Sequence, residues 1–214
     1  MLGANDGILS TASLVLGVAA SGASGAAIVT AGIAGLVAGA LSMAAGEYVS
    51  VSSQRDAEQA DIRLEERELR RDPQGELREL AGVYEKRGLP PALASEVAVA
   101  LSRRGALAAH ARDELGLDEQ RLARPFQAAW TSALSFSAGA ALPLIAVAAT
   151  PARARVGAAV VVTLISLGVL GDLGARLGGA PRRRATARVV AWGAIAMAIT
   201  AGIGALVGTI AQIS

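Results

Sequence analysis

The chain has 214 residues, of which 53% are hydrophobic and 18% charged, and it contains no cysteine. This composition is more apolar than that of an ordinary soluble domain, and the lack of thiols excludes disulfides and thiolate metal sites. Residues 55–124 hold fifteen of the eighteen acidic residues and thirteen of the twenty basic ones. Because the basic residues are interleaved with an excess of acids, we expect no nucleic-acid partner.

Five stretches are apolar enough over the roughly 20 residues that a helix needs to span a bilayer. They cover approximately residues 3–20, 26–50, 126–149, 156–175 and 187–211. The first stretch carries Asn5 and Asp6 and lacks the basic start of a signal peptide, so we interpret it as a membrane span. We therefore predict an all-α, polytopic membrane protein with five transmembrane helices. Helices 1 and 2 fall in residues 1–54, and helices 3 to 5 fall in residues 125–214.

The placement of arginine predicts the orientation, because basic loops stay in the cytosol. A cytosolic amino terminus also puts residues 55–124 and the loop from Arg176 to Arg188 in the cytosol. The opposite orientation would place eighteen of the twenty basic residues outside. We therefore expect a multi-pass protein of the cell (inner) membrane, with its amino terminus and residues 55–124 in the cytosol.

Glycine pairs at GxxxG spacing occur in three of the predicted spans and permit close helix contact. They are Gly35 and Gly39, Gly174 and Gly178, and Gly204 and Gly208. Two interpretations remain open from the spacing alone. The pairs serve either packing within one chain or the interface of a homodimer.

Residues 55–124 are predicted to form a three-helix cytosolic module between the second and third spans. The first helix continues from the second span to Asp72, and Asp72-Pro73 is typical of the start of a new helix. The second helix runs from Glu76 to Arg87, and the third runs from about Ala92 to Leu115. Three short amphipathic helices barely bury a core of their own. Pairing of two modules, or metal binding, would therefore stabilise them.

Two acidic residues fall where lipid should exclude charge. Asp6 lies near the start of the first span and Glu47 near the end of the second, so an antiparallel hairpin puts both on the same side of the membrane. Met43 lies one turn before Glu47. These three side chains predict a metal site between the helices. The alternative is two interfacial acids that reach water, with Met43 facing lipid.

A stripe of oxygen-bearing side chains runs from Glu47 to Asp72 at steps of three or four residues, and it includes Glu65 and Glu68. On a continuous helix such residues share one face. Stacked carboxylates repel one another, so bound cations would stabilise the stripe. The alternative is a solvated face that is neutralised by nearby arginines.

The other two helices of the predicted module supply more ligands. Glu76 and Glu79 lie on adjacent turns, while His110 and Glu114 are four residues apart and can reach one ion. A surface histidine near acids is the alternative. Together, carboxylates and an imidazole suit borderline divalent ions such as iron(II), manganese(II) or zinc.

The opening GANDGILSTASLVLGVAASG and the later GALSMAAGEYVSVSSQRDAEQADI resemble the vacuolar iron transporter family, whose members export ferrous iron and manganese. ELRELAGVYEKRGL, DELGL at Asp113–Leu117 and SFSAGAALPLI at Ser135–Ile145 match it as well. The resemblance implies five transmembrane helices, a dimer with a central pathway, and a cytosolic metal-binding module. The family's membrane aspartate and methionine fall on Asp6 and Met43. Its module glutamates fall on Glu65, Glu68, Glu76, Glu79 and Glu114. Where the family often has two methionines, this chain has His110 and Ala111.

We predict a transporter that exports ferrous iron, manganese or both from the cytosol. The resemblance implies proton antiport and a role in iron homeostasis. Zinc and cobalt are further candidate ions, no tightly bound cofactor is expected, and the expected partners are divalent ions, the bilayer and a second copy of the chain. An enzyme is not expected, because no nucleophile–base set or phosphate-binding loop appears. The rival hypothesis is a membrane-anchored metal buffer or sensor without transport. The predicted metal ligands are Asp6, Met43, Glu47, Glu65, Glu68, Glu76, Glu79, His110 and Glu114.

Overall fold

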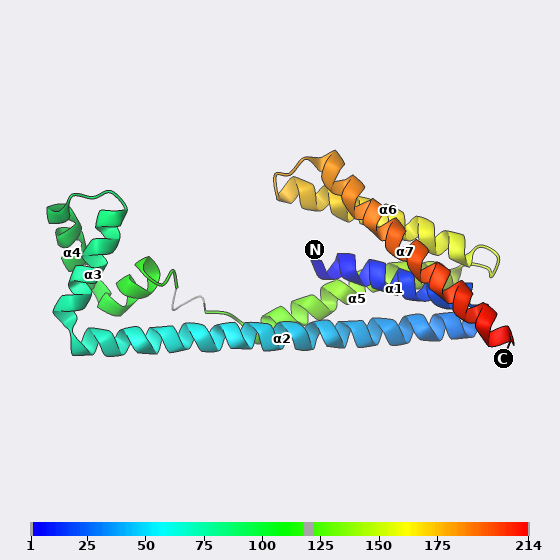
Figure 1. The fold of residues 1–214 in the computed structure, drawn as a ribbon, viewed down its shortest axis with the longest axis horizontal. Coiled ribbons are helices and arrows are strands. Elements are labelled where there is room, and N and C mark those ends of the chain that lie inside the picture. The colour runs from blue at the N-terminus through cyan, green and yellow to red at the C-terminus, as the bar shows by residue number, and fades with distance from the viewer. Residues whose placement is uncertain (1, 118–121, 214) are drawn as a thin grey trace. The chain divides into compact units, whose positions relative to one another are not determined.

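The computed structural model describes residues 2–117 and 122–213, and its regular structure in these residues is entirely helical (Figure 1). This confirms the predicted all-α class. The helices are α1 (Leu2–Ala20), α2 (Gly25–Arg71), α3 (Pro73–Lys86), α4 (Pro91–Asp113), α5 (Pro125–Ala149), α6 (Arg155–Leu177) and α7 (Arg182–Ile213). The chain divides into two compact units. We call Met1–Glu47 with Gln127–Ser214 the apolar unit, and Tyr48–Phe126 the charged unit.

Four helices among the described residues are long and apolar enough to cross a membrane, namely α2, α5, α6 and α7. The first predicted span, α1, is 19 residues long and is not among them. Asn5, Asp6 and three hydroxyl residues dilute its apolar character. The chain is thus a multi-pass membrane protein, and the fifth span stays a prediction.

The core of the apolar unit is built around α1. It contains Ala12, Val15, Leu16, Ile28, Val147, Ala159 and Met197. Three of these residues come from α1, while α2, α5, α6 and α7 contribute one each. The side chains of Thr11 and Ser13 are also buried. Neighbouring helices therefore cover these two hydroxyl groups, whereas Ser10 of α1 is exposed.

Glycines let other helices approach the backbone of α1 closely. A Cβ on Gly7 would overlap the carbonyl of Phe136 in α5, and a Cβ on Gly204 of α7 would overlap the backbone of Gly17. A Cβ on Gly208 would likewise overlap the backbone of Ser21. The Gly204 and Gly208 pair thus serves packing within the chain, as in other membrane helix contacts. The predicted homodimer stays a prediction.

Two glycines of α7 offer a matched test of this packing. Gly204→Ala places a methyl group against the backbone of α1, whereas Gly202 has open space around it. We expect Gly204→Ala to destabilise the protein by about 1–3 kcal/mol, as overpacking does. Gly202→Ala should leave stability unchanged or slightly raised. Thermal unfolding of both variants in detergent measures the difference, and equal unfolding temperatures would contradict the packing.

The charged unit consists of the end of α2 together with α3 and α4. Asp72 accepts a hydrogen bond from the backbone nitrogen of Gly75 at 2.9 Å, and Pro73 is the first residue of α3, as the sequence predicts. Leu80 and Ala81 of α3 pack against Ala98 and Ala109 of α4. A small core therefore holds α3 and α4 together.

The predicted third helix, from about Ala92 to Leu115, corresponds to α4 at Pro91–Asp113, but the structure interrupts it in the middle. Gly105 has φ 161° and ψ 95°, so α4 consists of two helical segments, and it ends at Asp113. Glycine is a poor helix former, and a break costs least there. Ala98 before this break and Ala109 after it both belong to the same small core. The second segment carries His110.

Candidate metal sites

The apolar unit contains a cavity of about 220 Å³ among α1, α2 and α5. Its lining residues are Asp6, Ser10, Thr11, Leu14, Gly35, Gly39, Ser42, Met43 and Phe136. The structure therefore brings two predicted ligands, Asp6 and Met43, to one space. Glu47, the third residue of that prediction, is half-buried and does not line the cavity.

The cavity combines a carboxylate, a thioether and three hydroxyl groups. Asp6 is exposed in the single chain, whereas Met43 is half-buried. The hydroxyl of Thr11 is buried without a hydrogen-bond partner, and that of Ser10 donates to the backbone oxygen of Asp6 at 2.6 Å. Such oxygen and sulfur atoms suit a partly dehydrated divalent ion. Sequence reasoning missed Thr11, although a hydroxyl within one turn or so of Asp6 was a visible signal.

A second cluster lies in the charged unit, where three helices meet. Ligand atoms of Glu65 on α2, Glu76 on α3 and His110 on α4 all lie within 4.8 Å of one another. Nδ1 of His110 is 2.8 Å from Glu65 Oε1, 3.7 Å from Glu76 Oε2 and 3.1 Å from Glu114 Oε2. His110 is fully buried, and its Nε2 has no hydrogen-bond partner. We call these four residues the module cluster.

The electrostatics of the module cluster favour a bound cation. Burial is the main cause that raises the pKa of Glu65 to about 7; the charges of Glu114, Glu76 and Glu68 contribute to this rise, and His110 opposes it. Burial also raises the pKa values of Glu76 and Glu114. Among the described residues, none of the three clustered glutamates pairs with lysine or arginine. A divalent ion would offset this repulsion and compete with protons for the same oxygens.

The remaining predicted module ligands, Glu68 and Glu79, have exposed side chains. The charge of Glu68 helps to raise the pKa of Glu65, and a hydrogen bond with Glu79 helps to raise that of Glu114. Both residues are therefore near neighbours of the module cluster, outside its tight set of ligand atoms.

Not every acid of the stripe on α2 belongs to the module cluster, and Glu58 is one that makes hydrogen bonds elsewhere. Glu58 accepts hydrogen bonds from Gln54 at 2.8 Å and from the backbone nitrogen of Ala123 at 3.0 Å. Its carboxylate therefore holds the end of the charged unit in place. In the part of the chain that the structure describes, Arg70 pairs with Glu66, which does not belong to the stripe.

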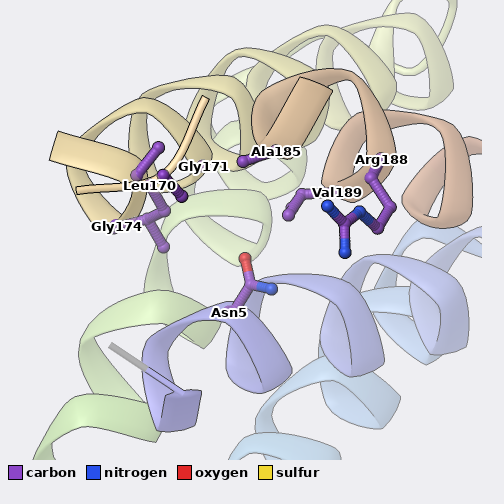
Figure 2. Close-up of a pocket in the computed structure, with 9 residues that line it drawn as sticks. Asn5, Leu170, Gly171, Gly174, Ala185, Arg188 and Val189 are labelled. Carbon is purple, nitrogen blue, oxygen red and sulfur yellow. The ribbon is translucent and has the colours of Figure 1, made fainter. Parts of the chain in front are cut away.

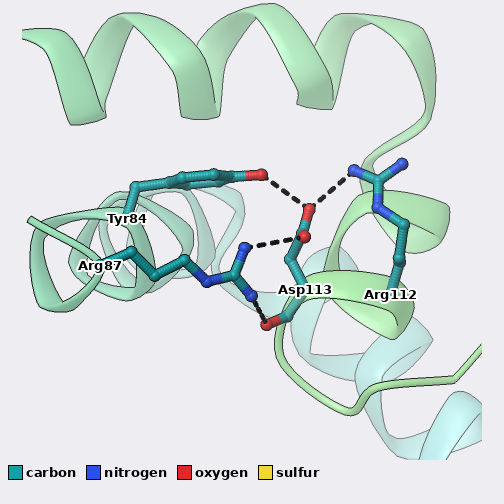
Figure 3. Close-up of polar contacts among 4 residues, drawn as sticks. All are labelled: Tyr84, Arg87, Arg112 and Asp113. Carbon is teal, nitrogen blue, oxygen red and sulfur yellow. Dashed lines mark hydrogen bonds and ion pairs between the residues drawn. The ribbon is translucent and has the colours of Figure 1, made fainter. Parts of the chain in front are cut away.

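Asp113 fixes the end of α4 beside the module cluster (Figure 3). Tyr84 donates to its Oδ2 at 2.8 Å, and Arg112 donates to the same atom at 2.7 Å. Arg87 bonds both its Oδ1, at 3.1 Å, and its backbone oxygen, at 2.7 Å. The hydrogen bond from Arg112 is the main reason that the pKa of Asp113 is lowered to about 2. Tyr84 and Arg87 belong to the end of α3, so this network ties α3 to the residue that precedes Glu114.

We expect Asp113→Asn to destabilise the charged unit by about 1–3 kcal/mol, because it weakens charge-assisted hydrogen bonds to a largely buried group. The pKa of Asp113 is lower in the folded state than in the unfolded state. Its stabilising contribution is therefore present above pH 4 or so and is lost as the pH falls toward about 2. Thermal unfolding at pH 7 measures the effect. Glu96→Gln removes an exposed acid on the same helix and should change little; an equal loss there would contradict the role of Asp113.

Comparison with known proteins places these features in a family context. Residues 1–205 match the family model described as the VIT family. The chain is 46% identical over 211 residues to a vacuolar iron transporter of Acanthamoeba castellanii. The aligned residues cover 98% of this chain and 78% of that protein. It is 38% identical over 209 residues to vacuolar iron transporter homolog 2 of Arabidopsis thaliana, covering 97% and 82%. It is 41% identical over 204 residues to vacuolar iron transporter homolog 5 of Oryza sativa subsp. japonica, covering 95% and 76%.

Proposed function

The chain belongs to the VIT family, whose members are transporters rather than enzymes, and we propose that it exports ferrous iron from the cytosol. Manganese is a second proposed substrate, and inward proton movement is the proposed driving force. The observation that carries the proposal is the cavity that Asp6 and Met43 share within the apolar unit. A carboxylate in a membrane span is destabilising, by roughly 2.5–3.5 kcal/mol at its centre. A passing cation offsets that penalty.

The intramembrane step depends on the mixture of atoms in this cavity. Asp6 supplies charge, Met43 supplies a polarizable sulfur, and the hydroxyl groups of Ser10, Thr11 and Ser42 replace water around the ion. A thioether favours iron(II) over harder ions, while the oxygens also accept manganese(II). We propose Glu47, one turn from Met43 on α2, as an acid that the ion meets before the cavity.

The module cluster is the proposed collecting site. Its three carboxylates and one imidazole suit iron(II), manganese(II), zinc and cobalt(II), and the burial of His110 makes nitrogen ligation well defined. The raised pKa of Glu65 means that a proton replaces the ion when the ion leaves. Such an exchange between ion and proton is the proposed basis of antiport.

The exposure of Asp6 supports a homodimer. In one chain, the cavity with Asp6 and Met43 is open and its carboxylate is exposed. A second copy with the same face opposed would enclose the ion with ligands from both chains. We propose a cytosolic amino terminus in the cell membrane, with residues 1–54 and 125–214 spanning it and residues 55–124 forming the cytosolic module. Export would then serve iron homeostasis.

The two internal methionines provide a controlled test of transport. Met43 lines the cavity, whereas Met197 is buried in the core of the apolar unit. We expect Met43→Leu to slow iron(II) uptake into proteoliposomes about tenfold and Asp6→Asn to abolish it, because both remove ligands. Met197→Leu conserves volume and should retain most of the uptake. Uptake should also rise with an imposed pH gradient that is acidic inside the vesicle. Unchanged uptake by Asp6→Asn would refute the intramembrane site.

A membrane-anchored buffer or sensor is the second candidate, and the module cluster itself favours it. Both functions predict that Glu65→Gln combined with Glu76→Gln weakens metal binding to the intact protein more than tenfold. Under transport, the same variant should raise the ion concentration needed for half-maximal uptake, because collection is impaired. Glu96→Gln, an exposed acid outside the cluster, is the control. Tight binding with no uptake by the unmodified protein would establish the buffer instead.

A further inference from the structure

A second cavity in the apolar unit is lined by none of the predicted metal ligands. It has a volume of about 410 Å³ and lies among the start of α1, the end of α6 and the start of α7 (Figure 2). Most of its walls are small or apolar residues, including Gly171, Gly174 and Ala185. Two polar side chains, Asn5 and Arg188, also line it. Ligand cavities are typically of roughly 300–1,000 Å³ and carry a few polar groups in mostly apolar walls.

The positive charge at this end of α6 and α7 is only partly neutralised. Asp172 pairs with Arg176 at 2.8 Å and with Arg182 at 2.6 Å. Arg188 has no acidic partner among the described residues, nor do Arg183 and Arg184, which are exposed. An anion is the ligand that this excess of charge attracts.

On the wall of this cavity formed by α1, Asn5 has a side-chain oxygen that also lacks a partner. Its Oδ1 atom is buried and has no hydrogen-bond partner. In Figure 2 its amide group points from α1 toward α6 and α7, into the same space that the guanidinium of Arg188 enters. A buried amide oxygen without a partner is destabilising. A ligand that binds here must therefore offer a hydrogen-bond donor as well as a negative charge.

The surroundings place this cavity at the level of lipid headgroups. Trp192 follows Arg188 by one helical turn on α7 and is exposed, as aromatic residues at the membrane interface are. The arginines from Arg182 to Arg188 occupy the first turns of the same spanning helix. Phosphate groups of the bilayer lie at this depth. The apolar walls would also disfavour a free hydrated phosphate.

We propose that this cavity binds the headgroup of an anionic phospholipid with a hydroxyl-bearing headgroup, of the phosphatidylglycerol type. Its phosphodiester oxygens accept hydrogen bonds from Arg188, and a headgroup hydroxyl donates to Oδ1 of Asn5. The glycines and alanines of α6 and α7 leave room for the glycerol backbone. This site involves none of the proposed metal ligands and does not depend on transport.

Native mass spectrometry of the full-length protein in detergent tests the proposal with added phosphatidylglycerol, phosphatidylcholine or inorganic phosphate. We expect one tightly retained phosphatidylglycerol per chain and at least tenfold weaker retention in Arg188→Gln. Arg153→Gln removes an exposed arginine from the loop between α5 and α6 and should change retention less than twofold. Ala185→Leu fills the cavity without changing charge and should also weaken retention. Asn5→Leu should narrow the preference for phosphatidylglycerol over phosphatidylcholine.

Several outcomes would overturn the proposal. Equal losses in Arg188→Gln and Arg153→Gln would mean that the lipid responds only to general charge. Binding of inorganic phosphate that is as tight as that of the lipid, and is lost in Arg188→Gln, would identify a free anion as the ligand. Unfolding temperatures of all variants identify any that fail to fold. If Ala185→Leu is unstable, Arg188→Lys serves in its place, since it keeps the charge but loses the forked geometry and should weaken retention.

Discussion

A helix that carries a carboxylate, an amide and several hydroxyls can lie within a bilayer only if other helices surround it. In the proposed topology, α1 is held by close contacts with α5 and α7 at Gly7, Gly17 and Gly204, while the carboxylate of Asp6 stays exposed in the single chain. Because α1 lies at the centre of the apolar unit, two adjacent residues on it line two different cavities. Asp6 faces the cavity with Met43, while Asn5 faces the cavity with Arg188. The metal site and the lipid site that we propose therefore depend on the same packing.

The charged unit faces a different constraint, because the carboxylates of the module cluster lie close together and repel one another. Each of three helices contributes ligands, so no single helix stacks all of the carboxylates. The hydrogen bonds around Asp113 and the small core at Leu80 hold α3 and α4 in place despite that repulsion. The cluster is thus preorganised for a cation by contacts that do not involve the cation. This supports a role in collecting ions rather than in folding around them.

Much of this architecture was visible in the sequence. The hairpin before α2, the start of α3 at Asp72 and the proximity of His110 to Glu114 follow from local rules of chain geometry, and the structure confirms them. The resemblance to the vacuolar iron transporter family is also confirmed. These predictions succeeded because the regular geometry of a helix determines which of its residues lie close together.

The failures concern contacts between elements. The break at Gly105 depends on what α4 must reach on α3, and the network at Asp113 joins residues that are almost 30 positions apart. Neither is encoded in a local pattern. Glu47 shows the same limit, because a shared side of the membrane did not bring it to the cavity of Asp6.

The unpartnered Nε2 of His110 has a consequence for how long an ion would stay. A histidine that binds metal through one nitrogen usually donates a proton from the other to a carboxylate or carbonyl, which orients the ring and makes it more basic. Here Nδ1 faces the glutamates, and Nε2 is buried without such an acceptor. The imidazole is therefore a weaker donor than its burial suggests. Fast exchange, rather than long residence, is the behaviour that this ring favours.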